Sequence, residues 1–530
     1  MQRTEHLIIG AGVAGLVLRR FLAAERVVIV DPRPASYKIG ESLIPELFRH
    51  PELAALLPRV QALPSYTAKY GTTFVSAAEV AFFPIGTGEA CSAMHVARSE
   101  LEQTMIDAWE IDVVRARVES IDFERKQVHT DAGSYAVDGL ILDCSGPAML
   151  VAAQLGEIEN LLPVHATWAY YDVVEERPEA FARQLRERGQ SYLQYDVRHR
   201  RPVPEADVDI EQIVRTTYLS QVDDGVWTWQ IPLFGGRMLS YGVVSRHGPV
   251  SDQAYREIAE AHHAPHFALA RRAEAGPEAF DRIHRRDGFA RRAKRPADRD
   301  FILLADAFGF SDPVYSVGTG FAVSQAIEVA ELLNRGAWSP ETCAAYVQRC
   351  HTTLDRARQA FEFWYSGAVI TDDRAADEVQ QDFLLGGLFQ TGISTHYGAA
   401  IDLSSLASER DKFEASWESA ELSEPVSAVL GLDDARELVG WSLRGARSCA
   451  GGVQLRWATE ELPELTMLIA DDESAQTPCF RRVGPLALSY MQLFDRPYPT
   501  GPGLTALFDA VAERLRGQTG RWREVEHGQP

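Results

Sequence analysis

The chain has 530 residues, of which 46% are hydrophobic and 24% are charged, as is usual for a globular protein in water. It carries 53 Lys and Arg residues against 75 Asp and Glu residues, a formal net charge of -22 that disfavours binding to the phosphate backbone of nucleic acids. The six cysteines show no zinc-site spacing, so we expect free thiols, no metal site and a cytoplasmic location. No apolar run approaches the roughly 18 residues that would span a membrane.

The N-terminal segment has the pattern of a dinucleotide-binding βαβ unit. An apolar strand at 7–9 runs into a G-x-G-x-x-G loop, a helix over 16–24 and a second strand at 27–30. In such a loop the glycines permit a tight turn, a close approach of pyrophosphate and close packing of the helix. The candidate cofactor residues are Gly10, Gly12, Ala14, Gly15 and, for the ribose, Asp31. A Gly-rich turn without ligand is the alternative. The N-terminal position of the unit, with no second such unit downstream, favours FAD.

The next elements are read from hydrophobic periodicity. In chain order we expect strands over 66–84, a helix over 96–109, a β-meander over 112–145, a strand-rich segment over 165–250 and a helix over 252–280. An Arg-rich connector over 282–299 should then lead to a buried strand at 301–305 and a helix over 321–333. The remaining residues read as largely helical.

This order predicts an α/β protein with two parts. Residues 1–340 should form a Rossmann-like FAD-binding domain, discontinuous in sequence, with an antiparallel sheet of about residues 165–250 inserted in it. Residues 341–530 should form a mostly α-helical cap on the substrate side.

Three further motifs carry a family resemblance: K-I-G-E-S at 38–42, W-x-W-x-I-P at 227–232, and D-A-F-G-F-S-D-P at 306–313 with its continuation to Gly320. With the glycine loop, they resemble the flavin-dependent halogenases over roughly residues 1–340. The resemblance implies a fold of the flavin monooxygenase (p-hydroxybenzoate hydroxylase-like) type. It also implies FAD supplied as FADH2 by a separate flavin reductase, and the use of O2 with chloride or bromide.

The resemblance carries over to particular residues. It implies FAD contacts by Gly40, Glu41, Ser42, Arg98, Asp306, Pro313 and Gly318. It places the motif residues Trp227, Trp229, Ile231 and Pro232 beside the flavin, where they would block oxygen insertion into substrate. Two indoles that simply pack a core are the alternative for this motif. Ala305, before Asp306, departs from the glycine usual in the family.

The turn after Asp306 is similar to the family's halide site. Backbone amides of Ser316, Val317 and Gly318 at a helix start would hold a bare anion, and Val317 is acceptable because the contact is through backbone. A Gly-rich helix entry without halide is the alternative.

Lys69 is the candidate catalytic residue. It lies in K-Y-G-T-T-F-V, similar to the family's K-x-G-x-x-F strand. A partly desolvated lysine can hydrogen-bond hypohalous acid or form a haloamine beside an arene. An ordinary surface lysine is the alternative. Ser76 stands where many relatives have Trp, so the resemblance does not determine which residue forms this wall of the substrate site.

The substrate class rests on two departures from the tryptophan halogenases. Tyr315 replaces their glutamate, and Gly71 after Lys69 resembles the phenol and pyrrole branch. We therefore expect an electron-rich phenol, pyrrole or related arene, free or bound to an acyl or peptidyl carrier protein. Glu362 and His396 are weak candidates for an activating base. The Arg-rich connector could dock an acidic carrier or could simply be solvated.

Two other functions remain open at this point. A flavin-dependent aromatic monooxygenase of the same fold would insert oxygen directly, and a degenerate FAD-binding protein would not turn over.

Overall fold

The structure is a computed structural model of the whole chain. It describes residues 1–43, 45–48, 50–75, 80–84, 93–188, 195–196, 201–202, 214–223, 225–271, 279–314, 316, 318–348, 350–351, 354, 453–457 and 465–469. Most of the expected helical cap, with Glu362 and His396, lies outside these residues. Within that region the structure describes two antiparallel strands, β26 (Val453–Trp457) and β27 (Leu465–Ile469), where helix was expected.

A five-stranded parallel sheet forms the base of the molecule. Its strand order is β24-β13-β2-β3-β9, with bounds β24 Phe301–Leu303, β13 Ile141–Asp143, β2 His6–Ile9, β3 Val27–Val30 and β9 Val113–Val114. All four pairings are parallel. Strand β24 pairs with β13, although strands β15 to β22 of a second sheet lie between them in the sequence. The parallel sheet is therefore discontinuous in sequence, as predicted.

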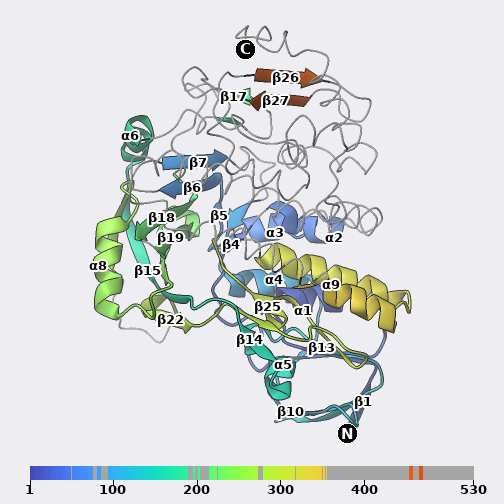
Figure 1. Cartoon of the computed structure of the whole chain (residues 1–530). Coiled ribbons are helices and arrows are strands. Elements are labelled where there is room, and N and C mark those ends of the chain that lie inside the picture. The colour runs from blue at the N-terminus through green and yellow to red at the C-terminus, as the bar shows by residue number, and fades with distance from the viewer. Residues whose placement is uncertain are drawn as a thin grey trace.

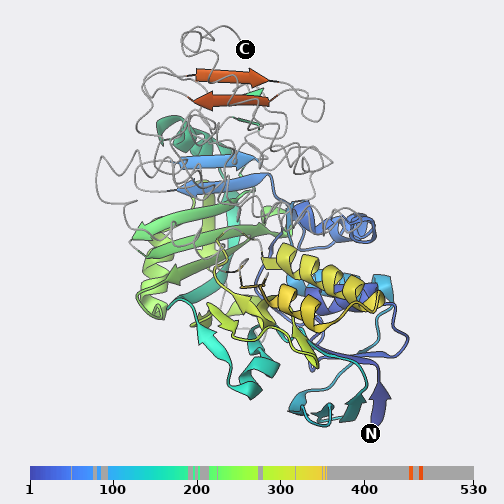
Figure 2. The ribbon, with the colours of Figure 1, turned by 45° about the vertical axis from the view of Figure 1, so that its right-hand side comes forward.

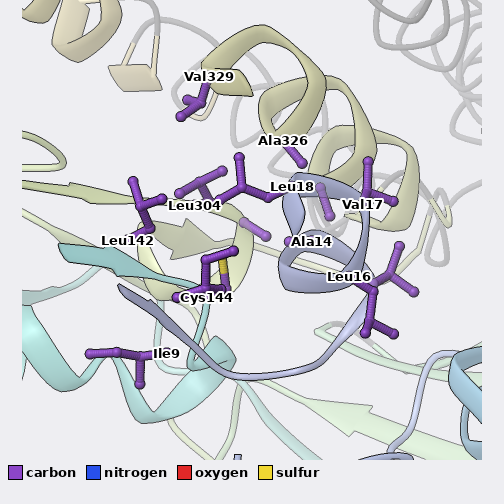
Figure 3. Close-up of a cluster of buried hydrophobic side chains, with 14 of the residues drawn as sticks. Ile9, Ala14, Leu16, Val17, Leu18, Leu142, Cys144, Leu304, Ala326 and Val329 are labelled. Atoms are coloured by element: carbon purple, nitrogen blue, oxygen red, sulfur yellow. The ribbon is translucent and has the colours of Figure 1, made fainter. Parts of the chain in front are cut away.

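Two helices cover this sheet and complete its core. They are α1 (Val13–Phe21), which follows the glycine loop, and α9 (Gly318–Asn334), which starts three residues earlier than expected. Their apolar side chains and those of the strands gather between the layers (Figure 3). The labelled members are Ile9, Ala14, Leu16, Val17, Leu18, Leu142, Cys144, Leu304, Ala326 and Val329. Burying this apolar surface fixes the glycine loop against the strand ends.

A second, mixed sheet lies beside the parallel one (Figure 1). Its strand order is β21-β15-β20-β19-β18-β6-β7, with β22 also paired to β15. The bounds are β6 Gly71–Val75, β7 Val80–Pro84, β15 His165–Glu176, β18 Thr217–Asp223, β19 Val226–Leu233, β20 Met238–Ser245, β21 Phe267–Arg271 and β22 His284–Asp287. Its pairings are antiparallel except β6 with β18, and α8 (Asp252–His262) packs on it through Tyr255. In Figure 2 the long strands of the mixed sheet, in green, are seen to one side of α9, in yellow.

The described part of the chain also contains smaller elements. Three short sheets contain β4 (Ser42–Leu43), β8 (Met94–His95) and β5 (Thr67–Ala68); β14 (Ile158–Asn160), β23 (Arg291–Ala293) and β25 (Gly309–Phe310); and β1 (Gln2–Thr4), β12 (Gly133–Val137), β11 (Gln127–Thr130) and β10 (Val118–Asp122). The remaining elements are α2 (Pro51–Ala54), α3 (Leu57–Gln61), α4 (Arg98–Trp109), α5 (Leu150–Leu155), α6 (Pro178–Arg188), β16 (Tyr195–Asp196) and β17 (Arg201–Pro202). No helix in the described part of the chain has the length and apolar character needed to cross a membrane.

Two expected elements differ from the structure. The helix over 252–280 is wrong beyond His262, because Pro265 interrupts it and Phe267–Arg271 instead pairs with β15 as β21. The Arg-rich connector contains β22 and β23 and is not merely solvated.

Acidic residues of this chain neutralise those arginines. Arg292 Nε lies 2.8 Å from Glu159 Oε2, and Arg295 Nη2 lies 3.0 Å from Glu157 Oε1. The positive charge that marks the connector in the sequence is therefore partly paired within the fold.

Candidate active site

The glycine loop has the geometry of a phosphate cradle. Gly10 has a φ of +101°, and a Cβ there would lie 2.3 Å from the Cys144 carbonyl oxygen. A Cβ on Gly15 would lie 2.0 Å from the Gly10 carbonyl oxygen, so both positions require glycine. A Cβ on Gly12 would meet only Glu102 Oε1, at 3.7 Å, which leaves the backbone before α1 open. The loop therefore fits the close approach of a dinucleotide pyrophosphate.

Asp31 ties the loop to the end of β3. Its Oδ2 accepts a hydrogen bond from Ala11 N at 2.8 Å, and its Oδ1 accepts one from Arg33 N at 2.7 Å. A carboxylate has about four lone-pair sites, so acceptor capacity remains for a ribose hydroxyl.

A buried ion cluster that the sequence analysis missed lies against the loop. Glu102 is fully buried and accepts from Arg98 Nη2 at 3.2 Å and from Lys38 Nζ. Arg98 is the first residue of α4, which starts two residues later than predicted, and its Nη1 lies 3.4 Å from Thr319 Oγ1 of α9. The two cations that pair with Glu102, whose Oε1 would lie 3.7 Å from a Cβ on Gly12, suit an anionic cofactor. The i,i+4 spacing of Arg98 and Glu102 was the available sequence signal.

Asp306 lies in the turn η7 (Ala305–Ala307), beyond the carboxyl end of β24. Burial raises the pKa of its carboxyl, and the positive charges of Arg98 and Arg286 oppose that shift. A desolvated acid in this place can accept hydrogen bonds from the hydroxyls of a ribityl chain. Pro313 and Gly318 follow in the segment that leads into α9.

The loop over 38–42 is anchored to the mixed sheet. Glu41 is buried, its Oε1 accepts a hydrogen bond from Tyr170 OH at 2.6 Å, and burial raises the pKa of its carboxyl. Tyr170 OH lies 2.8 Å from Tyr37 OH, which accepts from Trp168 Nε1 at 2.7 Å. No sequence pattern predicts these hydrogen bonds, because they join two segments that are distant in the sequence. Gly40, with a φ of +110°, lets this loop pass close to Arg98.

Lys69 lies in a buried cluster of hydroxyl groups. Its side chain is fully buried, so the alternative of an ordinary surface lysine is wrong. Lys69 Nζ donates to Ser42 Oγ at 3.1 Å, and Ser316 Oγ donates to the same oxygen at 3.2 Å. The structure thus brings together the candidate catalytic lysine and one residue of the candidate halide turn. Val317 and Tyr315 lie outside the described residues.

Ser316 has a φ of 57°, in the left-handed region that non-glycine residues rarely adopt. Its amide donates to the Pro313 carbonyl at 3.0 Å, which closes the turn. Strain of this kind persists where the surrounding structure over-determines the backbone, and it is common at ligand sites.

Two residues missed by the sequence analysis complete the cluster, Thr217 and His95. Thr217 Oγ1 lies 2.9 Å from Ser42 Oγ and 2.9 Å from His95 Nε2. Burial, and then the charge of Lys69, lower the pKa of His95 well below its usual range, while the backbone of Pro232 opposes the shift. A lone histidine in the apolar run A-M-H-V-A was the available signal.

The W-x-W-x-I-P motif forms β19, with Trp227 and Trp229 both buried on one face. Their ring centroids are 6.2 Å apart, and Trp229 Nε1 donates to Ser240 Oγ at 3.3 Å. Trp229 lies over Gly242 of β20, where a Cβ would be 2.1 Å from the indole. The described contacts are those of a packed core, and Ile231 and Pro232 are buried with it. A position beside a flavin stays a prediction.

Comparisons with known proteins bear on the family and the fold of the chain. Residues 206–378 match the family model described as tryptophan halogenase. The halogenase PltM is 16% identical with a TM-score of 0.59, covering 84% of this chain and 92% of its own, and it has been solved with phloroglucinol and FAD. The flavin-dependent brominase Bmp2 is 18% identical with a TM-score of 0.53, covering 73% of this chain and 94% of its own.

A flavoprotein/dehydrogenase from Cytophaga hutchinsonii is 20% identical with a TM-score of 0.54, covering 76% of this chain and 100% of its own. At these identities the structural likeness establishes the α/β flavoprotein fold. A comparison with curated proteins finds no match. The family match covers both W-x-W-x-I-P and the segment from Asp306 to Gly320, so the resemblance predicted from these motifs is confirmed. Residues 206–378 are thus similar to the halogenases, and the chain shares the flavoprotein fold with the solved structures.

Proposed function

We propose that the chain is an FADH2-dependent halogenase that uses O2 and chloride or bromide to halogenate an electron-rich arene. The observation that carries the proposal is the burial of Lys69 two hydrogen bonds away from Ser316, through Ser42. A buried ammonium surrounded by hydroxyl groups can hold a small polar oxidant away from bulk water.

FAD fits the open glycine loop. The backbone at Gly12 and the cations of Lys38 and Arg98 would bind the pyrophosphate, Asp31 the ribose and Asp306 the ribityl chain. When bound in its reduced form, FAD supplies the activation of oxygen. A separate flavin reductase would deliver it, because no second nucleotide-binding loop is apparent in the sequence.

The halide would bind at the turn over 316–318, where amides precede helix α9. Its two-electron oxidation gives hypohalous acid, which Lys69 would hold beside the arene. A carbon–halogen bond then forms while the halogen–oxygen bond breaks, and the ring proton leaves. Trp227 and Trp229 would keep the face next to the flavin closed to the arene.

We favour a phenol or pyrrole as substrate. PltM, of similar fold, has been solved with phloroglucinol, which is a phenol, and this chain has Tyr315 where tryptophan halogenases carry glutamate. The connector arginines that are paired within the chain, such as Arg292 with Glu159, leave less charge for docking an acidic carrier protein. That pairing supports a free substrate over a carrier-bound one.

Lys69→Ala tests the proposal, with Lys294→Ala, at an exposed lysine, as the matched control. The Lys69 variant should still bind and oxidise FADH2 but should lose halogenated product by at least about 100-fold, a typical loss for a group that acts directly on the reacting atoms. Product is measured by mass spectrometry and FADH2 oxidation by absorbance. Undiminished product would contradict the assignment of Lys69.

A further inference from the structure

Two strands of the Arg-rich connector each carry a pair of neighbouring arginines, Arg285 and Arg286 on β22 and Arg291 and Arg292 on β23. Neighbouring side chains on a strand point to opposite faces, so the two members of a pair have different surroundings. Arg285 and Arg292 are each paired with an acidic residue of this chain. In the part of the chain that the structure describes, Arg286 and Arg291 make no ion pair.

Arg286 and Arg291 instead converge on one uncharged acceptor. Both donate through Nη2 to the carbonyl oxygen of Pro147, at 3.3 Å and 2.8 Å respectively. Nε of Arg291 is buried and has no hydrogen-bond partner among the described residues. Burial, and then the charge of Arg291, lower the pKa of the Arg286 guanidinium, while the carboxyl of Asp306 opposes that shift. The fold thus holds two positive charges close together at a cost in free energy that a bound anion would offset.

The acceptor of this pair lies at the ligand crevice of the parallel sheet. Strand β3 lies on one side of β2 and β13 lies on the other, so the crevice in which such sheets bind ligands opens between the carboxyl ends of β2 and β13. The glycine loop follows β2, and the turn η2 (Gly146–Ala148), which contains Pro147, follows β13. A Cβ on Gly10 would lie 3.1 Å from Ser145 Cα, so the loop and the start of this turn are neighbours.

The pair also borders a residue assigned to FAD. The positive charges of Arg98 and Arg286 both act on the carboxyl of Asp306. Arg98 belongs to α4, whereas Arg286 belongs to β22 of the mixed sheet. Positive charges from two separate elements therefore flank the carboxyl that would bind the ribityl chain. In FAD the ribityl chain is joined directly to the pyrophosphate, so a charged group of the cofactor would follow within one bond.

We propose that Arg286 and Arg291 bind the pyrophosphate of FAD from the η2 side of the crevice, across from the glycine loop. A guanidinium presents its donors in a planar fork that matches the oxygens of a phosphate, and the phosphate charge strengthens these hydrogen bonds. The inference rests on the FAD-binding part of the proposed function and not on halogenation. It adds a contact between the mixed sheet and the cofactor, because β22 carries Arg286.

Binding of oxidised FAD to the whole chain, measured by the change in flavin fluorescence, tests this inference without halide, reductase or arene. Arg286→Gln and Arg291→Gln should each weaken FAD binding by about tenfold or more, because each removes a charged donor from the phosphates. Arg285→Gln and Arg292→Gln are the matched controls, one on each strand. They should bind FAD within about twofold of wild type, since each removes only an ion pair at the surface.

Stability without FAD separates a binding role from a structural one. Because neighbouring positive charges repel, Arg286→Gln and Arg291→Gln should unfold at the same urea concentration as wild type or at a higher one. In each variant the other arginine still donates to Pro147. Arg291→Lys, which keeps the charge without the fork, should recover part of the lost affinity. FAD binding equal to wild type in both glutamine variants, or weaker binding together with a lower urea midpoint without FAD, would overturn the proposal.

The phosphate of a second nucleotide bound beside FAD would have the same chemistry. Calorimetric titration of ADP into FAD-saturated protein distinguishes the two sources, and no binding is expected because the cofactor itself fills the site. Binding of ADP to this protein that Arg291→Gln abolishes would overturn the assignment to FAD.

The outcomes for the arginine pair and for the proposed function can be told apart. If FAD binding depends on Arg286 and Arg291 as stated but the wild-type protein makes no halogenated product, the proposed halogenation fails and the inference stands. If the wild-type protein makes halogenated product and both glutamine variants bind FAD as wild type does, the inference fails and the proposed function stands.

Discussion

Ala305 holds the backbone before Asp306 at a φ of 53°, in the left-handed region. A non-glycine residue in that region costs roughly 1–2 kcal/mol, a strain that glycine would not have. Ala305→Gly should therefore leave the free energy of unfolding nearly unchanged, because relief of strain offsets the greater freedom of glycine in the unfolded chain.

Ala326→Gly is the control, since Ala326 is buried in the interior of α9. It should lose about 1 kcal/mol or more from helix propensity alone. Urea unfolding of both variants checks the contrast, and equal losses would show that the backbone at Ala305 is not strained.

At this scale the sequence predicted residues whose role depends on local pattern. Gly10 and Gly15 could be recognised because the loop's own turn and helix impose glycine. Thr217 and His95 could not, because they meet Lys69 only after β4, β8 and β18 have come together. Contacts between side chains from distant segments produce no recognisable spacing in the sequence.

The packing of β19 on β20 depends on Gly242. A Cβ there would lie 2.1 Å from Trp229, which is itself confined by Trp168 and Trp227. Gly242→Ala should destabilise the fold by about 1–3 kcal/mol, as overpacking of a core commonly does, and should alter the near-UV circular dichroism of the tryptophans.

The double variant Gly242→Ala/Trp229→Phe tests the cause. The smaller ring should recover part of the stability lost in the single variant if the clash with the indole is responsible. Additive losses would mean that another feature of Gly242 is needed.

Elements with strong local periodicity were predicted well, and those set by tertiary pairing were not. The βαβ unit, β20 and α9 follow from runs of apolar residues. β21 was missed because its residues carry helix formers, although Pro265 marks the break and β15 supplies the partner. In the Arg-rich segment, β23 pairs with β14, whose residues, Glu159 among them, lie far away in sequence.

The stability of the whole molecule should depend on pH through Glu41, which couples the cofactor loop to the mixed sheet. Burial raises its pKa in the folded state, so folding takes up a proton. The stabilisation that comes from protonated Glu41 is fully present below the pKa of Glu41 in the unfolded chain. It is lost as pH rises through the higher pKa of Glu41 in the folded protein. Each unit of difference corresponds to about 1.4 kcal/mol.

Glu41→Gln should therefore gain stability relative to wild type on going from pH 5 to pH 8, since glutamine keeps the bond from Tyr170 without a charge. Glu124→Gln, at an exposed turn between β10 and β11, is the control and should show no such gain. Urea unfolding without cofactor, at pH 5 and at pH 8, measures the difference in free energy of unfolding between each variant and wild type. A constant difference between Glu41→Gln and wild type across this range would contradict the buried, proton-binding state of Glu41.

Mass spectrometry of the products made by the whole protein separates halogenation from its two alternatives. The protein is supplied with FAD, a flavin reductase, bromide and a panel of phenols, pyrroles and carrier-bound acyl groups. A halogenase should give products that carry bromine, recognised by its isotope doublet, and that form only when bromide is added. Oxygenated products indifferent to halide would contradict it in favour of a monooxygenase, and FAD binding without any turnover would contradict it in favour of a degenerate flavoprotein.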